Sequence, residues 1–290
     1  MKITKTSACI LFVTFLIGHA SVSSPATKQI VREKIRLEVP KALPAAVAEE
    51  PPGKPETTRE NGDWKEEDDS KLKIKLLETG EGFHGDQIQA KSGETWLGLF
   101  REKDGYYLRR TKLIVRREHD EIVDGEDTSI KTGKSVAVKG GGQTVFLVKN
   151  AKMLGDGEVK TLFSDHGQED LEQLKNGYRR DFEFNGEVYT LKVENKISRE
   201  EYLGKGSKLI LARRSDGKEQ ILNYLSEEGC NDCFWYLYWA GDLDRDGKPD
   251  FYLDLSWHYN VRDRRLFLSS PATEDGKLVK YVANFWTNGC

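Results

Sequence analysis

The segment FWYLYWAGDLDRDGKPDFYLDLS, residues 234–256, decides the fold. Its two flanks, FWYLYWA and FYLDLS, are short runs of aromatic and leucine residues, which are typical of strands and too short for a usual helix. Between them, DLDRDGKPD repeats aspartate at alternate positions and places Gly247 where the chain turns sharply. The segment therefore predicts two β-strands joined by an acidic loop.

The spacing within the loop predicts a cation site. Ca²⁺ takes about 6 to 8 oxygen ligands, with carboxylates preferred because the ion is hard and doubly charged. Asp242, Asp244 and Asp246 stand at the first, third and fifth positions, Lys248 at the seventh offers its backbone carbonyl, and Asp250 stands at the ninth. We therefore predict that these five residues bind Ca²⁺. The alternative is a solvated acidic turn, because Asp and Gly are common in turns.

The loop differs from a helix-flanked EF-hand loop. Its twelfth position is Leu253 instead of glutamate, and both flanks resemble strands. The segment AGDLDRDGKPDFYLDLS, residues 240–256, resembles the Asp-x-Asp-x-Asp-Gly-x-x-Asp loop of FG-GAP and VCBS-type repeats. This resemblance implies calcium binding within a β-propeller blade or a related β module. Only one such loop occurs and no fixed period recurs, so a propeller is less favoured than a sandwich or barrel.

The chain outside this segment also favours strands. From Lys71 onward, short runs with period-two alternation are separated by glycine-bearing turns, and Asn185-Gly186 suits a two-residue type I′ hairpin. We predict a mainly β fold of two antiparallel meanders, in a sandwich or barrel-like arrangement. The first meander lies in an N-terminal β region (71–160), and the second in a C-terminal β region with the calcium loop (161–290). A helix is expected at Gln168–Lys175, and whether the regions are separate domains stays open.

The N-terminal part predicts export. Lys2 and Lys5 precede an apolar run from Ala8 to Gly18 and the triplet Gly-His-Ala at 18–20, which is the layout of a secretory signal peptide (1–20). The alternative, a membrane anchor, would need about 20 apolar residues. Residues 21–70 are rich in charge and proline and predict a disordered linker. We expect a periplasmic, secreted or cell-surface protein with no integral membrane segment after cleavage.

Export makes the cysteines candidates for a disulfide bond. Cys230, Cys233 and Cys290 remain after signal removal, so one thiol is left over. A bond from Cys290 to Cys230 or Cys233 is our preferred pairing, and a Cys230–Cys233 bond is the alternative. The sequence does not choose between them.

Neither charge nor motifs identify an activity. The 45 basic and 48 acidic residues give a formal net charge of −3, which offers no strong field for nucleic acid. The chain carries no His-Glu-x-x-His, Gly-x-Ser-x-Gly or P-loop motif. A second acidic turn, HDEIVDGED at 119–127, could hold an ion but lacks alternate spacing, and a solvated loop is the preferred interpretation.

Strand alternation suggests a binding surface. It places Phe234, Tyr236 and Tyr238 on one face and Trp235 and Trp239 on the other. One face is expected to be core. The other is either covered too, as in a sandwich, or an aromatic surface for a protein or carbohydrate ligand. Two hypotheses follow. The first is an exported calcium-binding β module with a non-catalytic binding or structural role, and the second is an exported hydrolase with an unrecognised active site.

Overall fold

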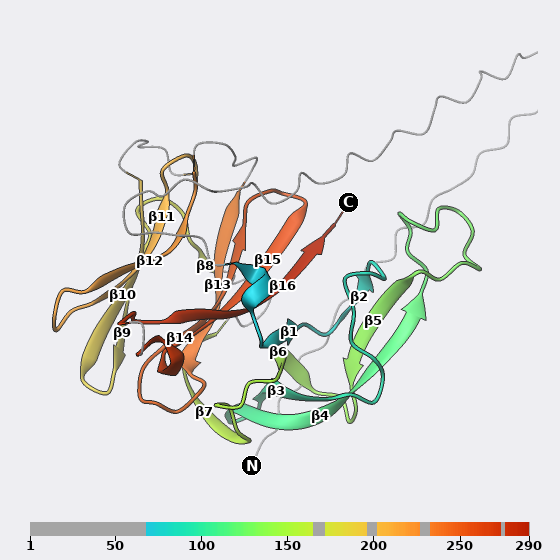
Figure 1. The fold of residues 1–290 in the computed structure, drawn as a ribbon, viewed down its shortest axis with the longest axis horizontal. Coiled ribbons are helices and arrows are strands. Elements are labelled where there is room, and N and C mark those ends of the chain that lie inside the picture. The colour runs from blue at the N-terminus through green and yellow to red at the C-terminus, as the bar shows by residue number, and fades with distance from the viewer. Residues whose placement is uncertain (1–67, 165–171, 196–201, 227–232, 274–275, 290) are drawn as a thin grey trace, which may run out of the picture. The chain divides into compact units, whose positions relative to one another are not determined.

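The computed structural model describes residues 68–164, 172–195, 202–226, 233–273 and 276–289 (Figure 1). This part of the chain contains sixteen strands and two short 3-10 helices and no α-helix. The elements are η1 (Asp69–Lys71), β1 (Lys75–Leu77), β2 (Gly80–Phe83), β3 (Thr95–Glu102), β4 (Gly105–Glu118), β5 (Gly133–Val138), β6 (Gln143–Lys149), β7 (Gly157–Ser164), β8 (Glu172–Gln173), β9 (Arg179–Phe184), β10 (Glu187–Glu194), β11 (Lys208–Arg213), β12 (Glu219–Tyr224), β13 (Phe234–Asp242), β14 (Asp250–Ser256), β15 (Val261–Leu268), η2 (Ser270–Ala272) and β16 (Lys280–Asn288).

Twelve of the strands form one large antiparallel sheet. Its main order is β1-β6-β3-β4-β7-β13-β14-β15-β16, and the sheet curls into a nearly closed barrel. The long strand β4 pairs with β3 along its first half and with β5 along its second, so the β4–β5 hairpin extends beyond the barrel (Figure 1). β7 pairs with β4 on one side and β13 on the other, which joins strands from both predicted regions into one sheet.

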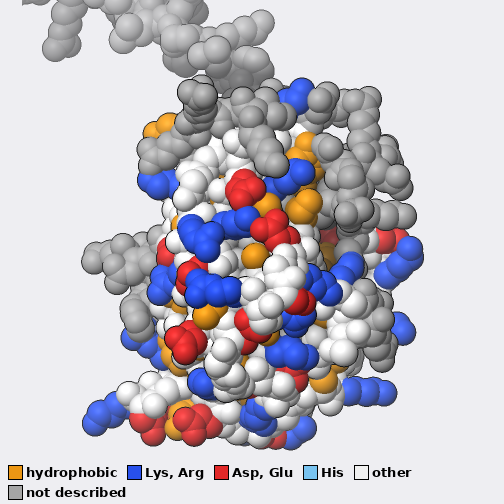
Figure 2. All heavy atoms as spheres, turned by 90° about the vertical axis from the view of Figure 1, so that its left-hand side faces the viewer, with side chains coloured by type: hydrophobic (Ala, Val, Ile, Leu, Met, Phe, Trp, Pro, Cys, Tyr) orange, Lys and Arg blue, Asp and Glu red, His pale blue; other side chains and the backbone are white. Residues whose placement is uncertain are grey.

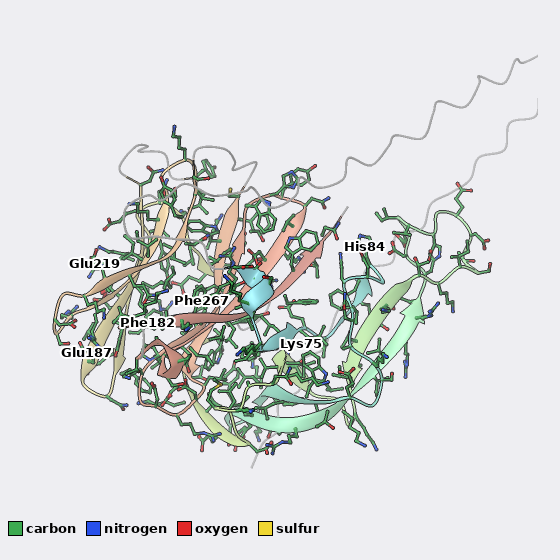
Figure 3. The ribbon with its side chains drawn as sticks, viewed as in Figure 1. Lys75, His84, Phe182, Glu187, Glu219 and Phe267 are labelled. Atoms are coloured by element: carbon green, nitrogen blue, oxygen red, sulfur yellow. The ribbon has the colours of Figure 1, made fainter. Side chains whose placement is uncertain are left out.

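The other four strands, β9 to β12, form a consecutive antiparallel meander. Asn185 and Gly186 connect β9 to β10 with φ angles of 51° and 79°, and a positive φ at both positions is what a type I′ turn requires. Phe182 of β9 and Phe267 of β15 lie between this small sheet and the large one, whereas Glu187 and Glu219 lie on its far side (Figure 3). Apolar side chains therefore join the two sheets.

The outer face of the small sheet is covered by ion pairs. Lys192 Nζ lies 2.7 Å from carboxylate oxygens of both Glu194 and Glu219, and Arg214 lies 2.9 Å from Asp181. On the side of the molecule seen in Figure 2, basic and acidic side chains alternate without a large patch of either sign. These exposed pairs contribute little stability each and keep this face polar.

Two hydrophobic cores meet at β13. Inside the barrel, the ring of Phe146 lies 4.7 Å from that of Tyr252 and 6.4 Å from that of Trp239, measured between centroids. Between the sheets, Trp235, Leu237 and other apolar residues form the second core. Both faces of β13 and β14 are therefore covered, which explains why their sequences are almost continuously apolar.

The predicted alternation along β13 is wrong at one residue. The register with β14 shifts between Leu237 and Trp239, so Tyr238 is the extra residue of a β-bulge. After the bulge, each side chain of β13 points to the opposite face of the sheet from the one that strict alternation predicts. Trp239 packs in the barrel core together with Tyr238, whereas Ala240 joins Trp235 in the core between the sheets.

The mainly β fold with antiparallel meanders is confirmed, and the large sheet resembles a barrel. The helix expected at Gln168–Lys175 is wrong in its described part, because Glu172–Gln173 form β8 and pair with β13. The predicted signal peptide and nearly all of the linker lie outside the described residues. The linker was expected to reach residue 70, but the Asp69 carboxylate already accepts hydrogen bonds from Tyr281 and Asn284, at 2.9 and 3.0 Å.

A substitution at Gly241 tests how closely β13 approaches β7. A Cβ at Gly241 would lie 2.4 Å from the Lys160 carbonyl oxygen and 2.5 Å from the Trp239 ring. We expect Gly241→Ala to lower the free energy of unfolding by about 1–3 kcal/mol, because backbone must move to admit the methyl group. The measurement is urea unfolding, with Gly204→Ala as the matched control, since nothing lies within 4 Å of a Cβ at Gly204. Equal stability of the two variants would contradict this packing.

Candidate metal site

The acidic loop connects the end of β13 to the start of β14. Arg245 and Gly247 adopt positive φ angles of 60° and 84°, which fold the loop back on itself. The Arg245 guanidinium donates to the carbonyl oxygens of Glu158 and Gly155, at 3.1 and 3.2 Å, and Asn185 donates to the Gly247 carbonyl oxygen at 3.0 Å. The outer side of the loop is thus held by two parts of the chain, the residues around the start of β7 and the β9–β10 turn.

Three of the predicted ligands come together. Asp242, Asp244 and Asp250 each offer a carboxylate oxygen, and these oxygens lie within 4.8 Å of one another. Asp242 is 9% exposed, and its Oδ2 accepts a hydrogen bond from the Gly247 N–H at 3.2 Å. Its Oδ1 is buried and has no hydrogen-bond partner in the described part of the chain. Burying a carboxylate oxygen without a hydrogen-bond donor costs folding free energy. A cation bound to the three carboxylates would satisfy this oxygen, so the cluster fits a cation site.

Asp250 connects the cluster to a distant part of the chain. Its side chain is fully buried, and its Oδ2 accepts hydrogen bonds from the N–H groups of Leu243 and Asp244, at 2.6 and 3.3 Å. Its Oδ1 accepts from both the N–H and the hydroxyl of Ser269, at 2.7 and 2.9 Å. Asp250 therefore closes the loop onto itself and onto the chain that follows β15.

Asp246 and Lys248 lie beside the cluster. Asp246 Oδ1 accepts hydrogen bonds from the Lys248 N–H and from the Ser269 hydroxyl, both at 2.9 Å. The Lys248 side chain lies 3.4 Å from Asp246 Oδ2. Asp246 is not among the three carboxylates that the structure brings together, and Ser269 connects it to Asp250.

Two serines that no sequence motif indicates support this site. Ser269 bonds both Asp246 and Asp250, and the Ser270 N–H donates to Asp244 Oδ2 at 3.2 Å. The two serines follow β15 and stand 19 or more residues beyond Asp250 in the chain, so no local spacing could have indicated them. Only the antiparallel pairing of β14 with β15 brings them to the loop.

Burial and mutual repulsion govern the charge of the cluster. Burial, together with the neighbouring aspartates, raises the pKa of Asp242 and of Asp244 above the ordinary value, and it raises the pKa of Asp250 well above it. Hydrogen bonds from backbone groups oppose these increases only in part. A proton or a bound cation would relieve the same repulsion.

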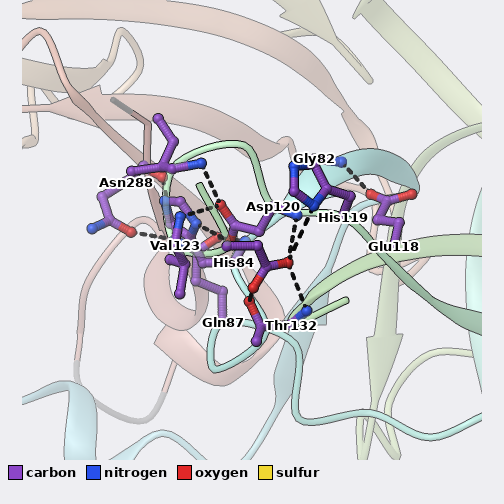
Figure 4. A network of polar contacts seen from close by, with 11 residues as sticks. Gly82, His84, Gln87, Glu118, His119, Asp120, Val123, Thr132 and Asn288 are labelled. Atoms are coloured by element: carbon purple, nitrogen blue, oxygen red, sulfur yellow. Dashed lines mark hydrogen bonds and ion pairs between the residues drawn. The ribbon is translucent and has the colours of Figure 1, made fainter. Parts of the chain in front are cut away.

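The second acidic turn uses its carboxylates to fix its own backbone (Figure 4). Asp124 accepts hydrogen bonds from the N–H groups of Asp120 and Thr132, both at 2.9 Å, and from the Thr132 hydroxyl at 2.6 Å. Asp120 contacts the His84 ring at 2.6 Å. The preferred interpretation of a solvated loop is wrong for Asp120 and Asp124, which are buried. Burial favours their protonated forms, but these hydrogen bonds outweigh it and lower the pKa of both acids.

The predicted disulfide stays a prediction. Cys233 Sγ lies 3.3 Å from the carbonyl oxygen of Trp257, and Cys230 and Cys290 lie outside the described residues.

Comparison with protein-family models, with curated proteins and with solved structures finds no match to this chain. The likeness of residues 240–256 to FG-GAP and VCBS-type loops therefore stays a prediction. No helix in the described part of the chain has the length and apolar character needed to span a bilayer.

The raised pKa values predict how stability changes with pH when calcium is absent. Because the pKa of each acid is higher in the folded protein than in the unfolded chain, the folded state binds extra protons from about pH 4 upward. Proton binding to these acids stabilises the folded state relative to the unfolded chain. This stabilisation is lost as the pH rises through the pKa values of the folded protein. In EGTA, we expect Asp242→Asn to become more stable relative to the native protein between about pH 4 and pH 8, since an amide at position 242 carries no charge.

The measurement for this prediction is urea unfolding in EGTA across that pH range. Asp86→Asn is the control, because Asp86 is exposed and lies outside the loop. A stability difference between Asp242→Asn and the native protein that does not change with pH would refute the prediction.

Proposed function

We propose that the protein is an exported calcium-binding β module with a non-catalytic binding or structural role at the cell surface or in the periplasm. The observation that carries the proposal is the buried, unpartnered Oδ1 of Asp242, which lies in a cluster with the carboxylates of Asp244 and Asp250. The layout of residues 1–20 supports export.

The donor set favours calcium over other metal ions. The clustered side chains offer only oxygen, which suits hard cations, and the group contains no His or Cys that would favour zinc or copper. Mg²⁺ requires a nearly ideal octahedron and retains several waters, whereas Ca²⁺ accepts irregular sets of carboxylate and carbonyl oxygens. Asp246 and the Lys248 carbonyl complete the proposed ligand set.

The surroundings of the cluster favour a structural role for the ion. Asp250 is fully buried and bonded to Leu243 and Ser269, so its carboxylate joins the β13–β14 loop to the chain after β15. An ion bound here would strengthen that junction by neutralising the carboxylates that repel one another.

Thermal unfolding with and without calcium tests the proposal. Extracellular sites of this kind have dissociation constants of about 10⁻⁴ to 10⁻³ M, so about 1 mM Ca²⁺ would add roughly 0.4 to 1.4 kcal/mol of stability. We expect the melting temperature to rise from EGTA to millimolar Ca²⁺ in the native protein. The rise should disappear in Asp242→Ala and Asp244→Ala and persist in Asp86→Ala.

Two results would refute the calcium site. One is an unchanged melting temperature of the native protein in Ca²⁺, and the other is an equal rise in all three variants. Magnesium at the same concentration should give a smaller rise, because the loop offers an irregular set of oxygens.

A further inference from the structure

A second site lies at one mouth of the barrel, away from the acidic loop. A cavity of about 620 Å³ opens there and is lined by strand ends and by the chain after β1. We call it the barrel-mouth pocket. The mouths of β-barrels are frequent ligand sites, and such sites combine apolar walls with a few well-placed polar groups. Its lining includes Glu78, Phe234, Tyr236, Asp254, Tyr259 and Arg264.

One wall of the pocket is a row across three neighbouring strands. Tyr236 of β13 pairs directly with Asp254 of β14, which pairs directly with Arg264 of β15. Residues directly opposite each other in an antiparallel sheet project to the same side. Their side chains therefore stand next to one another on the barrel side of the sheet.

Buried contacts hold this row in place. Arg264 is 4% exposed, bonds the carboxylates of Glu78 and Asp254, and lies with its Cζ 3.8 Å from the centroid of the Tyr238 ring. Glu78 Oε1 also accepts a hydrogen bond from the hydroxyl of Tyr252, which is fully buried. Four contacts thus fix the guanidinium and the Glu78 carboxylate before any ligand arrives, which is the preorganisation that a binding site needs.

The fixed groups leave one acceptor and one donor for a ligand. The hydrogen bonds of Glu78 all go to Oε1, and those of Arg264 use Nε and Nη1. Glu78 Oε2 and Arg264 Nη2 take part in none of these bonds. Two adjacent hydroxyl groups on a sugar ring match such a pair, because one can donate to the carboxylate while its neighbour accepts from the guanidinium.

Aromatic rings border the same pocket. The rings of Phe234 and Tyr236 lie 5.6 Å apart between centroids, and Tyr259 is 61% exposed. Partly exposed aromatic rings provide flat apolar faces with little loss of side-chain entropy. The C–H face of a pyranose ring packs against such a surface while its hydroxyls reach polar groups at the rim.

We propose that the barrel-mouth pocket binds a pyranose ring of a carbohydrate. The Glu78 carboxylate and the Arg264 guanidinium would bond adjacent hydroxyls, and the aromatic residues Tyr236 and Phe234 would pack against the ring. The inference rests on the binding role proposed above and gives that role a ligand class, but it does not require the calcium loop.

Other ligand classes fit the pocket less well. An anion would gain little from Arg264, because Glu78 and Asp254 already compensate its charge. An extended peptide would add to an open strand edge, but β13 is paired on both sides, with β14 and with β7 and β8. Hydrolysis of a sugar normally uses two carboxyl groups. Both oxygens of Asp254 are engaged, by Ser256 and by Arg264, so only Glu78 has an open oxygen.

A glycan array tests the proposal. The purified, fluorescently labelled protein is applied to immobilised glycans that present neutral hexoses, pentoses, amino sugars and uronic acids as pyranosides, once in millimolar Ca²⁺ and once in EGTA. The strongest soluble glycan is then titrated by calorimetry. We expect binding to at least one class of pyranoside, with at least a tenfold loss of affinity in Tyr236→Ala and in Glu78→Gln.

Tyr202→Ala is the matched control, because Tyr202 is 76% exposed and does not line the pocket. It should bind as the native protein does. If Glu78→Gln does not fold, the half-buried Tyr236 still provides the test. Absence of binding to every glycan, or binding that neither pocket variant weakens, would overturn the inference. Calcium-linked melting without glycan binding would refute the carbohydrate site alone, and glycan binding without calcium-linked melting would refute the calcium site alone.

Discussion

The buried Asp250 carboxylate joins the acidic loop by hydrogen bonds to the chain that follows β15, and the geometry of the loop depends on these hydrogen bonds. Its two oxygens accept hydrogen bonds from the loop on one side and from Ser269 on the other. A fully buried carboxylate is tolerated only when donors surround it. Here the donors are mostly backbone N–H groups. The pairing of β13 with β14 positions those of Leu243 and Asp244, and the pairing of β14 with β15 positions that of Ser269. The loop geometry is therefore a consequence of the sheet, and the sheet end is in turn held by the loop.

Strand β13 contributes residues to both sites, and the bulge at Tyr238 reverses its faces between them. Before the bulge, Tyr236 faces the barrel-mouth pocket, and Trp235 packs between the sheets. After it, Trp239 fills the barrel core and Gly241 allows the chain to approach β7 closely before the loop begins. A regular strand would have placed Trp239 between the sheets. A single extra residue thus moves Trp239 from the core between the sheets into the barrel core.

Local features of the sequence were sufficient for many of the strands, the hairpin turn and the main part of the acidic cluster, but not for β8, where a helix was expected. The aromatic runs beside Asp242 and Asp250 predicted β13 and β14, and Asn185-Gly186 predicted its turn because few residues other than Asn and Gly tolerate a positive φ. Alternate spacing placed Asp242, Asp244 and Asp250 in one group, and their carboxylate oxygens lie within 4.8 Å of one another. It did not reveal that Asp246 lies beside this group and is connected to Asp250 through the Ser269 hydroxyl.

Contacts between distant parts of the chain could not be predicted in the same way. Glu78 and Arg264 are 186 residues apart, and nothing in the composition around either residue indicates that they bond. Their contact arises only because the sheet curls until the chain after β1 reaches β15. The bulge at Tyr238 was also hidden, since strict alternation is the default expectation for any strand. Aromatic residues along β13 suggested a binding face, but the polar partners that give the pocket its chemistry came from other strands.

The two proposed sites share the β13–β14 hairpin, and this bears on how calcium would affect the pocket. The loop closes one end of the hairpin, and the pair Tyr236 and Asp254 lies towards the other end. Ladder pairs, apolar contacts on both faces and the buried Arg264 hold that second end independently of the loop. A weak calcium site therefore has little free energy with which to change the geometry of the pocket, since an ion can shift an equilibrium only by its own difference in affinity. Calcium would act as a local clamp on the loop, and the pocket would keep its shape whether or not the ion is bound.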